Sequence, residues 1–292
     1  MRFFQKHPFL MIVIGIFGIS LSSIFVKYSQ APSSVTAATR LLWTVVMLTP
    51  YVFGNTAVRQ ELRTVSRKLA LLSGLSGLFL AIHFVLWFES LQHTSVASST
   101  TIVCTEVIWV ALGFCLFLKG RLSGKAVAAI VITLLGSALI ALADSGSHAQ
   151  LYGDILSLLA AVSVAIYTLI GRVVRSRVST AVYTYMVYGV CAVFLVITCL
   201  AQGHDLFSFG PSSWIVGGLL ALFSTILGHS IFSWCLKYFS PAFVSASKLC
   251  EPVVAAVLAA LLFAEIPTVA QLLGCCLIVG GVLFYSHLER RG

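Results

Sequence analysis

Residues 69–91 read LALLSGLSGLFLAIHFVLWFESL, an almost uninterrupted apolar run whose single charged side chain, Glu89, lies near its end. An α-helix rises about 1.5 Å per residue, so about 20 mainly apolar residues cross the hydrocarbon core of a membrane. A helix also satisfies its backbone polar groups internally, which that core requires. The run therefore predicts a transmembrane helix.

Similar runs fill the rest of the chain. The sequence of 292 residues is 59% hydrophobic and only 9% charged, whereas a soluble domain is roughly half apolar and about a quarter charged. The connections between runs are short, so no separate soluble domain is expected. The predicted helices span residues 9–28, 33–53, 69–91, 95–118, 124–142, 153–172, 180–201, 212–235, 242–263 and 267–287. This pattern predicts an all-α integral membrane protein with ten transmembrane helices.

The first run has a second interpretation. Arg2 and Lys6 precede it, and small residues such as Ser20 lie near its end, as in a secretory signal peptide. The run is long for such a peptide, and its removal would break the internal repeat described below. We therefore favour a first transmembrane helix.

The basic residues favour one orientation in the membrane. Ten helices place both termini on the same side, and fifteen of the eighteen Lys and Arg residues fall on that side. Basic residues mark cytoplasmic loops, so both termini are predicted to be cytoplasmic in a multi-pass protein of the cell membrane. The net charge of +9 then reflects topology and contact with anionic membrane lipids, and no nucleic-acid partner is expected.

The eight cysteines lie within the apolar runs. Cysteine packs there as a small apolar residue, so we predict packing roles and no disulfide framework. The histidines show no metal-ligand spacing. Neither a metal nor a cofactor is expected.

A shift of 145 residues aligns the two halves of the chain, placing Glu106 on Glu251 and Gly136 on Gly281. The same shift aligns Leu91 with Leu236, Ser95 with Ser240, Ala97 with Ala242 and Leu116 with Leu261. Each half holds five predicted helices, an odd number, so the second half enters the membrane with the opposite orientation. Inverted repeats suit transport by alternating access. Duplicated bundles also occur in channels and membrane enzymes, and the repeat alone leaves those classes open.

Several motifs are similar to those of a known family. The stretch WCLKYFSP at 234–241 leads into EP at 251–252, Glu265 and Gly274 follow, GDIL opens the sixth predicted helix at 153–156, Lys27 and Tyr28 close the first, and Arg40 lies in the second. Together they resemble ten-helix members of the drug/metabolite transporter superfamily. Those proteins contain two EamA-type domains, which here would span residues 1–145 and 146–292.

The resemblance implies a transporter of small metabolites, commonly an exporter of amino acids or related compounds. The first half departs from the family pattern at two positions. Val107 stands where a proline is usual, and Gly120 stands where an acidic residue is frequent. The motifs therefore indicate the fold better than the substrate.

Four charged side chains fall well inside the predicted helices, away from the helix ends: Arg40, Glu106, Lys248 and Glu251. A charge inside the hydrocarbon costs at least about 2.5 to 3.5 kcal/mol, so such side chains face a cavity or a partner. Glu106 and Glu251 hold equivalent positions and are predicted to meet near the bundle centre. Each is a candidate for proton coupling or for binding a substrate amine. Pairing within the protein is the alternative for both and is favoured for Glu106.

Lys248 lies three residues before Glu251, so both are predicted on one helical face, where an ion pair forms locally. Pro252 lacks an amide hydrogen and predicts a bend in this helix. A bend beside two charges predicts a substrate platform. Alternatively, Lys248 extends to the cytoplasmic interface. Arg40 is expected to bind a substrate carboxylate or to hold Glu106 or Glu251, the structural role being favoured.

Histidine and aromatic side chains supply further candidates. His83 and His229 fall in the third and eighth predicted helices, where each lines the cavity or packs as a hydrogen-bonded residue, the latter being favoured. Trp87, Trp234 and Tyr167 are candidates for aromatic walls of a substrate site.

The working hypothesis is a secondary active transporter that exports a small metabolite by alternating access, with protons as the candidate coupling ion. The sequence has no HExxH, no glycine-rich phosphate loop and no Ser/His/Asp cluster, so no catalytic residue is assigned. The alternatives are a membrane-embedded lipid-modifying enzyme and a channel-type protein that conducts lipids or ions. A closed central pocket favours transport, and a lateral groove favours lipid chemistry. Whether the protein forms a homodimer is left open.

Overall fold

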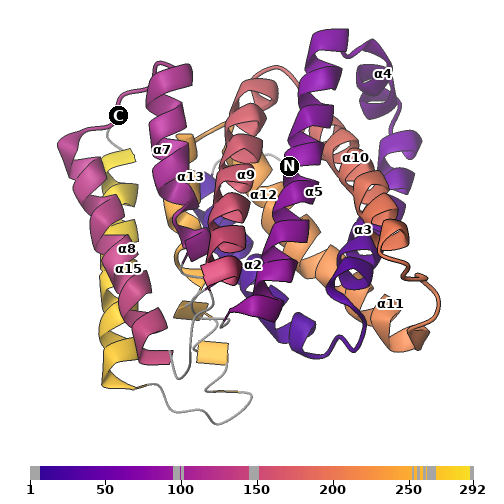
Figure 1. The fold of residues 1–292 in the computed structure, drawn as a ribbon. Coiled ribbons are helices and arrows are strands. Elements are labelled where there is room, and N and C mark those ends of the chain that lie inside the picture. The colour runs from indigo at the N-terminus through magenta and orange to yellow at the C-terminus, as the bar shows by residue number, and fades with distance from the viewer. Residues whose placement is uncertain are drawn as a thin grey trace.

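The computed structural model describes residues 7–94, 99, 102–144, 151–251, 253–254, 257–258, 261 and 268–289. These residues form helices and short connections, with no strand among them (Figure 1). The helices lie side by side as a bundle, and α8 (Gly124–Asp144) and α15 (Val269–Glu289) lie together at one side of it. The all-α prediction is confirmed for this part of the chain.

Seven helical stretches are long and apolar enough to span a membrane. Six of them correspond to single helices: α2 (Pro8–Lys27), α3 (Ser33–Gly54), α5 (Arg67–His93), α9 (Leu151–Arg175), α10 (Thr180–Ala201) and α15. The seventh covers Gly210–Cys235, and two shorter apolar helices cover Ile102–Phe117 and Gly124–Leu139. Their positions agree within a few residues with nine of the ten predicted runs.

The predicted ninth helix lies partly outside the described residues. Its first part is α13 (Pro241–Lys248), which Ser240 caps by accepting a hydrogen bond from the Phe243 amide. Ten transmembrane helices and the cytoplasmic position of both termini therefore remain predictions.

The predicted eighth helix is not α-helical throughout. It consists of α11 (Gly210–Leu219), the π-helix η1 (Leu220–Ser230) and α12 (Ile231–Cys235). Two side chains reinforce the wider spacing, since Thr225 and Ser230 each donate a hydrogen bond to the carbonyl five residues earlier. The predicted span over 212–235 is thus present as a helical stretch, and its central part is π-helical, a geometry that is rare overall and frequent at functional sites.

Helix α2 packs backbone to backbone against η1. A Cβ atom on Gly18 would lie 2.8 Å from the carbonyl oxygen of Phe223 and 2.9 Å from the amide nitrogen of Gly228. Glycine at this position therefore permits the close approach of the two helices.

The closest helix pairs come in equivalent couples under the 145-residue shift. The shift relates α2 to α9, α3 to α10, and α5 to α11 and η1. The contact of α5 with α9 therefore corresponds to the contact of η1 with α2, and the contact of α5 with α10 corresponds to that of α11 with α3. In the pairs α3–α10 and α8–α15, the shift relates the two helices of the pair to each other. This exchange of partners is what a pseudo-two-fold relation between the halves produces.

Two equivalent glycines lie where α8 meets α15. A Cβ atom on Gly136 would lie 2.7 Å from the carbonyl oxygen of Gly274, and one on Gly281 would collide with Thr133 Oγ1. The two positions paired by the sequence shift thus face the same interface from opposite sides.

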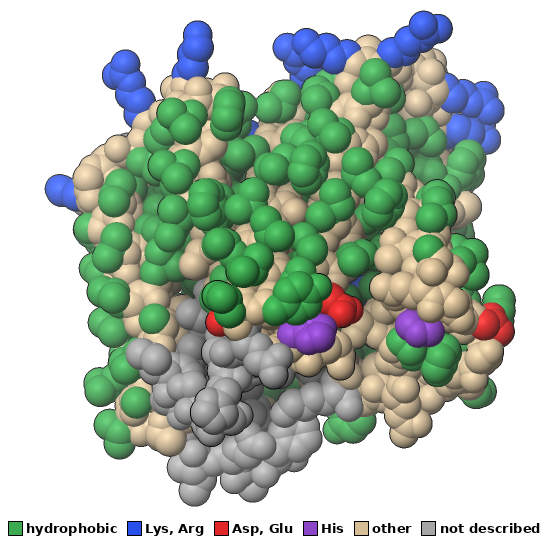
Figure 2. All heavy atoms as spheres, in the orientation of Figure 1, with side chains coloured by type: hydrophobic (Ala, Val, Ile, Leu, Met, Phe, Trp, Pro, Cys, Tyr) green, Lys and Arg blue, Asp and Glu red, His purple; other side chains and the backbone are tan. Residues whose placement is uncertain are grey.

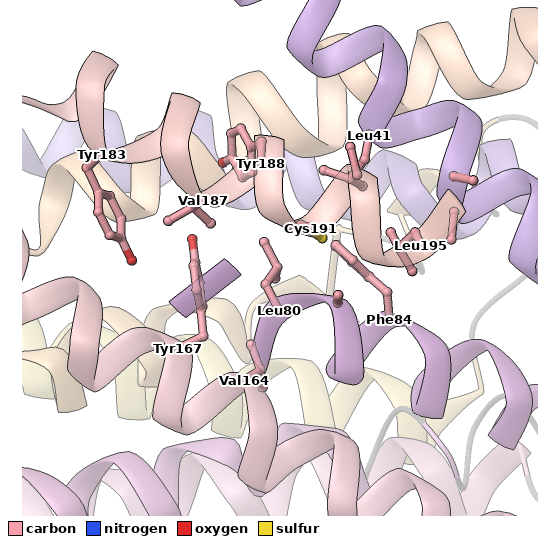
Figure 3. Close-up of a cluster of buried hydrophobic side chains, with 14 of the residues drawn as sticks. Leu41, Leu80, Phe84, Val164, Tyr167, Tyr183, Val187, Tyr188, Cys191 and Leu195 are labelled. Carbon is pink, nitrogen blue, oxygen red and sulfur yellow. The ribbon is translucent and has the colours of Figure 1, made fainter. Parts of the chain in front are cut away.

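A buried core joins α3, α5, α9 and α10. Figure 3 shows its centre, where Leu80 and Phe84 of α5 and Tyr167 of α9 point toward Val187 and Tyr188 of α10. A second core joins α2, α7 (Glu106–Phe117), α8, α12, α13 and α15.

Charged side chains divide between the two ends of the bundle. Lys and Arg side chains gather at the end that includes the short helix α4 (Thr56–Thr64), and His, Asp and Glu side chains on the visible face lie toward the other end (Figure 2). We call these the basic end and the outer end. At the basic end, the Glu61 carboxylate of α4 accepts a hydrogen bond of 2.6 Å from the Ser179 amide, at the start of α10.

Candidate functional site

A central, partly open cavity lies between the two halves. It is lined by residues of α2, α3, α5, α7, α9, η1 and α13 and by Glu251. Ten of the sixteen lining residues form equivalent pairs under the 145-residue shift: Ile19 and Val164, Phe84 and His229, Val103 and Lys248, Cys104 and Leu249, and Glu106 and Glu251. The cavity therefore lies on the pseudo-axis that relates the repeats.

A narrower, 3₁₀-type turn precedes each of the two equivalent carboxylates. In the first half, the Thr105 amide donates to the Ile102 carbonyl. In the second half, the Cys250 amide donates to the Ser247 carbonyl in the same way. These bonds span three residues instead of four, a 3₁₀-type geometry that marks breaks within helices. Glu106 is thus the first residue of α7 and directly follows this turn.

Glu106 is held by an ion pair that joins the two halves. The ammonium of Lys248 lies 2.8 Å from Glu106 Oε1, and both side chains are largely buried. The predicted local pair between Lys248 and Glu251 is wrong. Helix α13 ends at Lys248 and a turn follows, and the Lys248 ammonium binds Glu106 of the other half instead. Lys248 also does not extend to the basic end.

Glu251 has a different environment. Its backbone carbonyl accepts a hydrogen bond of 3.4 Å from Ser20 Oγ. Within the described part of the chain, its carboxylate has no hydrogen bond and no ion pair within 4 Å, although it lines the cavity. Pro252, predicted to bend the helix here, lies outside the described residues.

Arg40 is 1% exposed and lines the cavity from α3. Its Nε donates a hydrogen bond of 2.8 Å to Thr225 Oγ1 of η1, and its guanidinium carbon lies 4.6 Å from the centre of the Phe84 ring. Among the described residues no carboxylate lies within 4 Å of it. The predicted pairing with Glu106 or Glu251 is therefore wrong for this conformation, since a neutral hydroxyl and an aromatic ring hold the side chain.

Both predicted histidines line the cavity. His83 Nδ1 lies 3.0 Å from the carbonyl of Ala160, so this nitrogen carries the proton and donates it. The ring of His83 stacks parallel to Trp87, which also lines the cavity. The ring of His229 packs edge-on against Phe84, with 5.7 Å between ring centres.

Two predicted aromatic residues do not form the cavity wall. Tyr167 is buried behind it, where its hydroxyl bonds Ser233 Oγ at 2.8 Å. Trp234 packs against Tyr238, with 4.3 Å between ring centres, and is absent from the lining. Trp234 lies in α12 beyond η1, where the π-helical turns change which face each residue occupies.

The cavity also presents polar atoms that the sequence did not single out. Ser22 Oγ, Ser224 Oγ, Ser245 Oγ and Trp87 Nε1 are buried without a hydrogen-bond partner, and all four residues line the cavity. Buried polar groups normally have partners, so these atoms mark where a polar molecule or water binds. Serines are frequent in apolar helices for packing reasons, so their role was not apparent from the sequence.

A second cavity, the outer vestibule, lies at the outer end. Eight of its sixteen lining residues are polar, among them Gln30, Ser34, Glu89, Gln92 and His204. The two cavities share one lining residue, Phe84.

Toward the basic end, arginine side chains of α9 donate hydrogen bonds to backbone carbonyls of the second half. Arg172 donates to the carbonyls of Leu236 and Phe239, and Arg175 donates to the carbonyl of Ser233. These bonds satisfy carbonyls at the end of α12 and beyond it, where the helix leaves them free. At the other end, Phe84 lines both cavities, so the central cavity adjoins the outer vestibule in this conformation.

The profile of the EamA-like transporter family matches residues 7–142 and 151–287. The chain belongs to the EamA-like transporter family. The two matches give this EamA-like transporter its two-repeat architecture, as the sequence predicted, and identify it as a membrane transporter.

Relatives of this EamA-like transporter are also transporters by name. A Bacillus subtilis protein named "Uncharacterized transporter YxxF" is 27% identical over 226 residues, which cover 74% of this chain and 69% of the relative. An Archaeoglobus fulgidus transporter is 27% identical over 194 residues, or 65% and 67% of the two chains. A crystal structure with 19% sequence identity superposes with a TM-score of 0.80 and covers 98% of both chains. That likeness concerns the fold.

Proposed function

We propose that this EamA-like transporter is a secondary active carrier that exports small metabolites of no net charge, such as zwitterionic amino acids or related compounds. One observation carries the proposal. Glu251 and Arg40 line the same cavity, on the axis of the repeats, and among the described residues neither has an opposite charge within 4 Å.

The charges of the cavity favour a net-neutral substrate. Arg40 and Lys248 contribute two positive charges, and Glu106 and Glu251 contribute two negative charges, so the sum is zero. An unbalanced charge in the membrane interior is costly. A zwitterion keeps the balance, whereas a monovalent cation or anion breaks it.

The two ends of a zwitterion have complementary partners. Because Lys248 already neutralises Glu106, the free carboxylate of Glu251 is the acceptor for a substrate ammonium. Arg40 uses only Nε for its hydrogen bond to Thr225, so its remaining N–H groups are donors for a substrate carboxylate. The unpartnered hydroxyls of Ser22, Ser224 and Ser245 provide further hydrogen bonds to a polar substrate.

The remaining parts of the proposal concern the transport cycle. We propose alternating access between two inverted five-helix repeats, residues 1–145 and 146–292, in ten membrane helices with both termini in the cytoplasm. Glu251 is the proposed site of proton coupling, since a protonated carboxylate no longer holds an ammonium. We place the protein in the cell membrane, and a homodimer is compatible with the proposal but is not required by the site.

Counterflow in proteoliposomes tests the function. Vesicles containing purified protein are loaded with amino acids, nucleosides, polyamines or cationic drugs, and the labelled compound is supplied outside. Accumulation above protein-free vesicles is expected for zwitterions and not for polyamines. Accumulation of cations alone would overturn the substrate class. No accumulation across a panel that a control carrier moves would overturn the carrier function.

Direction and coupling need a second experiment. Vesicles with an imposed pH gradient are compared in the two membrane orientations, which accessible-cysteine labelling distinguishes. Export coupled to protons predicts that a gradient acidic on the outer-vestibule side drives substrate toward that side. Equal rates with and without the gradient would overturn proton coupling.

A further inference from the structure

Phe84 separates the two cavities of the transporter. In the part of the chain that the structure describes, it is the one residue that lines both the central cavity and the outer vestibule. Its side chain is only 1% exposed, so the ring fills the space between them. Figure 3 shows it pointing from α5 toward Cys191 and Leu195 of α10.

Aromatic and cationic groups from three elements hold this ring. The guanidinium of Arg40 on α3 lies 4.6 Å from its centre, and His229 of η1 meets it edge-on at 5.7 Å. Phe88, one turn further along α5, lies 6.4 Å away. Cation–π and aromatic contacts of this kind are individually weak, so a carrier can break and remake them during its cycle.

Phe84 and His229 are equivalent residues that contact each other. The 145-residue shift relates them, and both line the central cavity. In an inverted repeat the two halves exchange conformations during the cycle, so each residue takes the place of its equivalent. The position that Phe84 holds toward the outer end is then held by His229 toward the basic end in the opposite state.

We propose that Phe84 is the outer gate of the transport route and limits the size of the substrate, and that His229 is the corresponding gate toward the basic end. This proposal adds a gate to the proposed function. Only the test by substrate size rests on that function. Opening requires a rotation of the Phe84 ring away from Arg40 and His229. The gate is closed again when the ring returns to these partners.

Accessibility of Cys104 tests the gate without any substrate. Cys104 lines the central cavity, and the other seven cysteines are replaced by serine or alanine. A membrane-impermeant maleimide is applied from the outer-vestibule side to the parent and to F84A, F84Y and F88A. F84A is expected to label about tenfold faster than the parent, because the open state becomes more populated.

The two other variants are matched controls. F84Y keeps the ring, and Phe88 is a buried phenylalanine on the same helix that lines only the vestibule. Both are expected to label at the parent rate. Equal labelling of F84A and the parent, or an equal increase in F88A, would overturn the gate. If F84A does not yield monodisperse protein, F84L serves in its place.

His229 is tested from the opposite side. H229A is expected to raise the labelling of Cys104 by maleimide applied at the basic end, and F84A is not. An increase in H229A from the outer side alone would contradict the exchange of roles between equivalent residues.

Substrate size is the last readout. In counterflow, F84A is expected to raise the rate of bulky zwitterions relative to small ones by about tenfold, as removal of a large side chain enlarges a pocket. An unchanged size profile would show that Phe84 does not limit the size of the substrate. If the parent carries no substrate but F84A still increases labelling, the proposed function fails and the gate stands.

Discussion

The two halves of the transporter place a carboxylate at the same point, yet the two carboxylates differ in their partners. Glu106 is neutralised by Lys248 at 2.8 Å, and Glu251 has no ion-pair partner among the described residues. The reason lies at one pair of equivalent positions, since Val103 stands where the second half has Lys248. A single lysine therefore separates a structural carboxylate from one that is available to a ligand.

The largest expected effect is on transport by Glu251 variants. Glu251→Gln removes the charge proposed to bind the substrate ammonium, and counterflow is expected to fall about 100-fold because one member of a buried charge pair is lost. Glu106→Gln, at the equivalent position, is the matched comparison and is expected to fall less. Rates for Glu106→Gln at or below those for Glu251→Gln, with both proteins folded, would reverse the assignment.

Loss of Lys248 should affect stability. Lys248→Met leaves Glu106 as an unpaired buried charge, which is expected to destabilise the fold by about 3 kcal/mol. The double variant Lys248→Met with Glu106→Gln removes both charges and should recover most of this loss. Unfolding in detergent measures all three proteins. Additive losses in the double variant would show that the ion pair contributes nothing to stability.

A lysine at position 103 would make the two halves alike. In Val103→Lys the new ammonium is expected to reach Glu251 as Lys248 reaches Glu106, and thus to compete with the substrate. Counterflow should fall about tenfold, with little change in the unfolding midpoint. Adding Glu251→Gln to Val103→Lys should then have little further effect on transport. A further large loss would show that the two positions are not equivalent in space.

The glycine pair gives the smallest of these effects. Gly136→Ala and Gly281→Ala each crowd the interface of α8 and α15, and each is expected to destabilise the fold by about 1–3 kcal/mol. Gly280→Ala is the control, because a Cβ atom there meets nothing within 4 Å. Similar unfolding midpoints for Gly280→Ala and Gly136→Ala would contradict this packing.

Much of the fold followed from the sequence. Apolar runs located nine helical stretches to within a few residues, because burial in a membrane imposes a length and a composition. The repeat placed Glu106 and Glu251 in one cavity, and the charged and imidazole candidates Arg40, His83 and His229 also line it. Charge is costly in a membrane, so it was a reliable indicator of where the cavity lies.

The partners of these residues could not be predicted. Lys248 contacts a residue 142 positions away, and no local pattern predicts a contact between halves. Lys248 pairs with Glu106 and not with Glu251, and Trp234 follows η1 and is absent from the cavity lining. The unpartnered serines and Phe84 looked like ordinary packing residues, because only the cavity distinguishes them.

The π-helical segment has a consequence for how the sequence tolerates change in length. Ser224 and His229 are five residues apart and both line the cavity, which suits the five-residue bonding of a π-helix. In a regular α-helix each residue turns by about 100°, so five residues would separate the two side chains by about 140°. Deleting one residue between them would leave the pair four residues apart, the spacing at which an α-helix keeps two side chains on one face. The deletion would also shift Thr225 relative to Arg40. An insertion or deletion in this segment would therefore alter the cavity wall without replacing any residue that lines it.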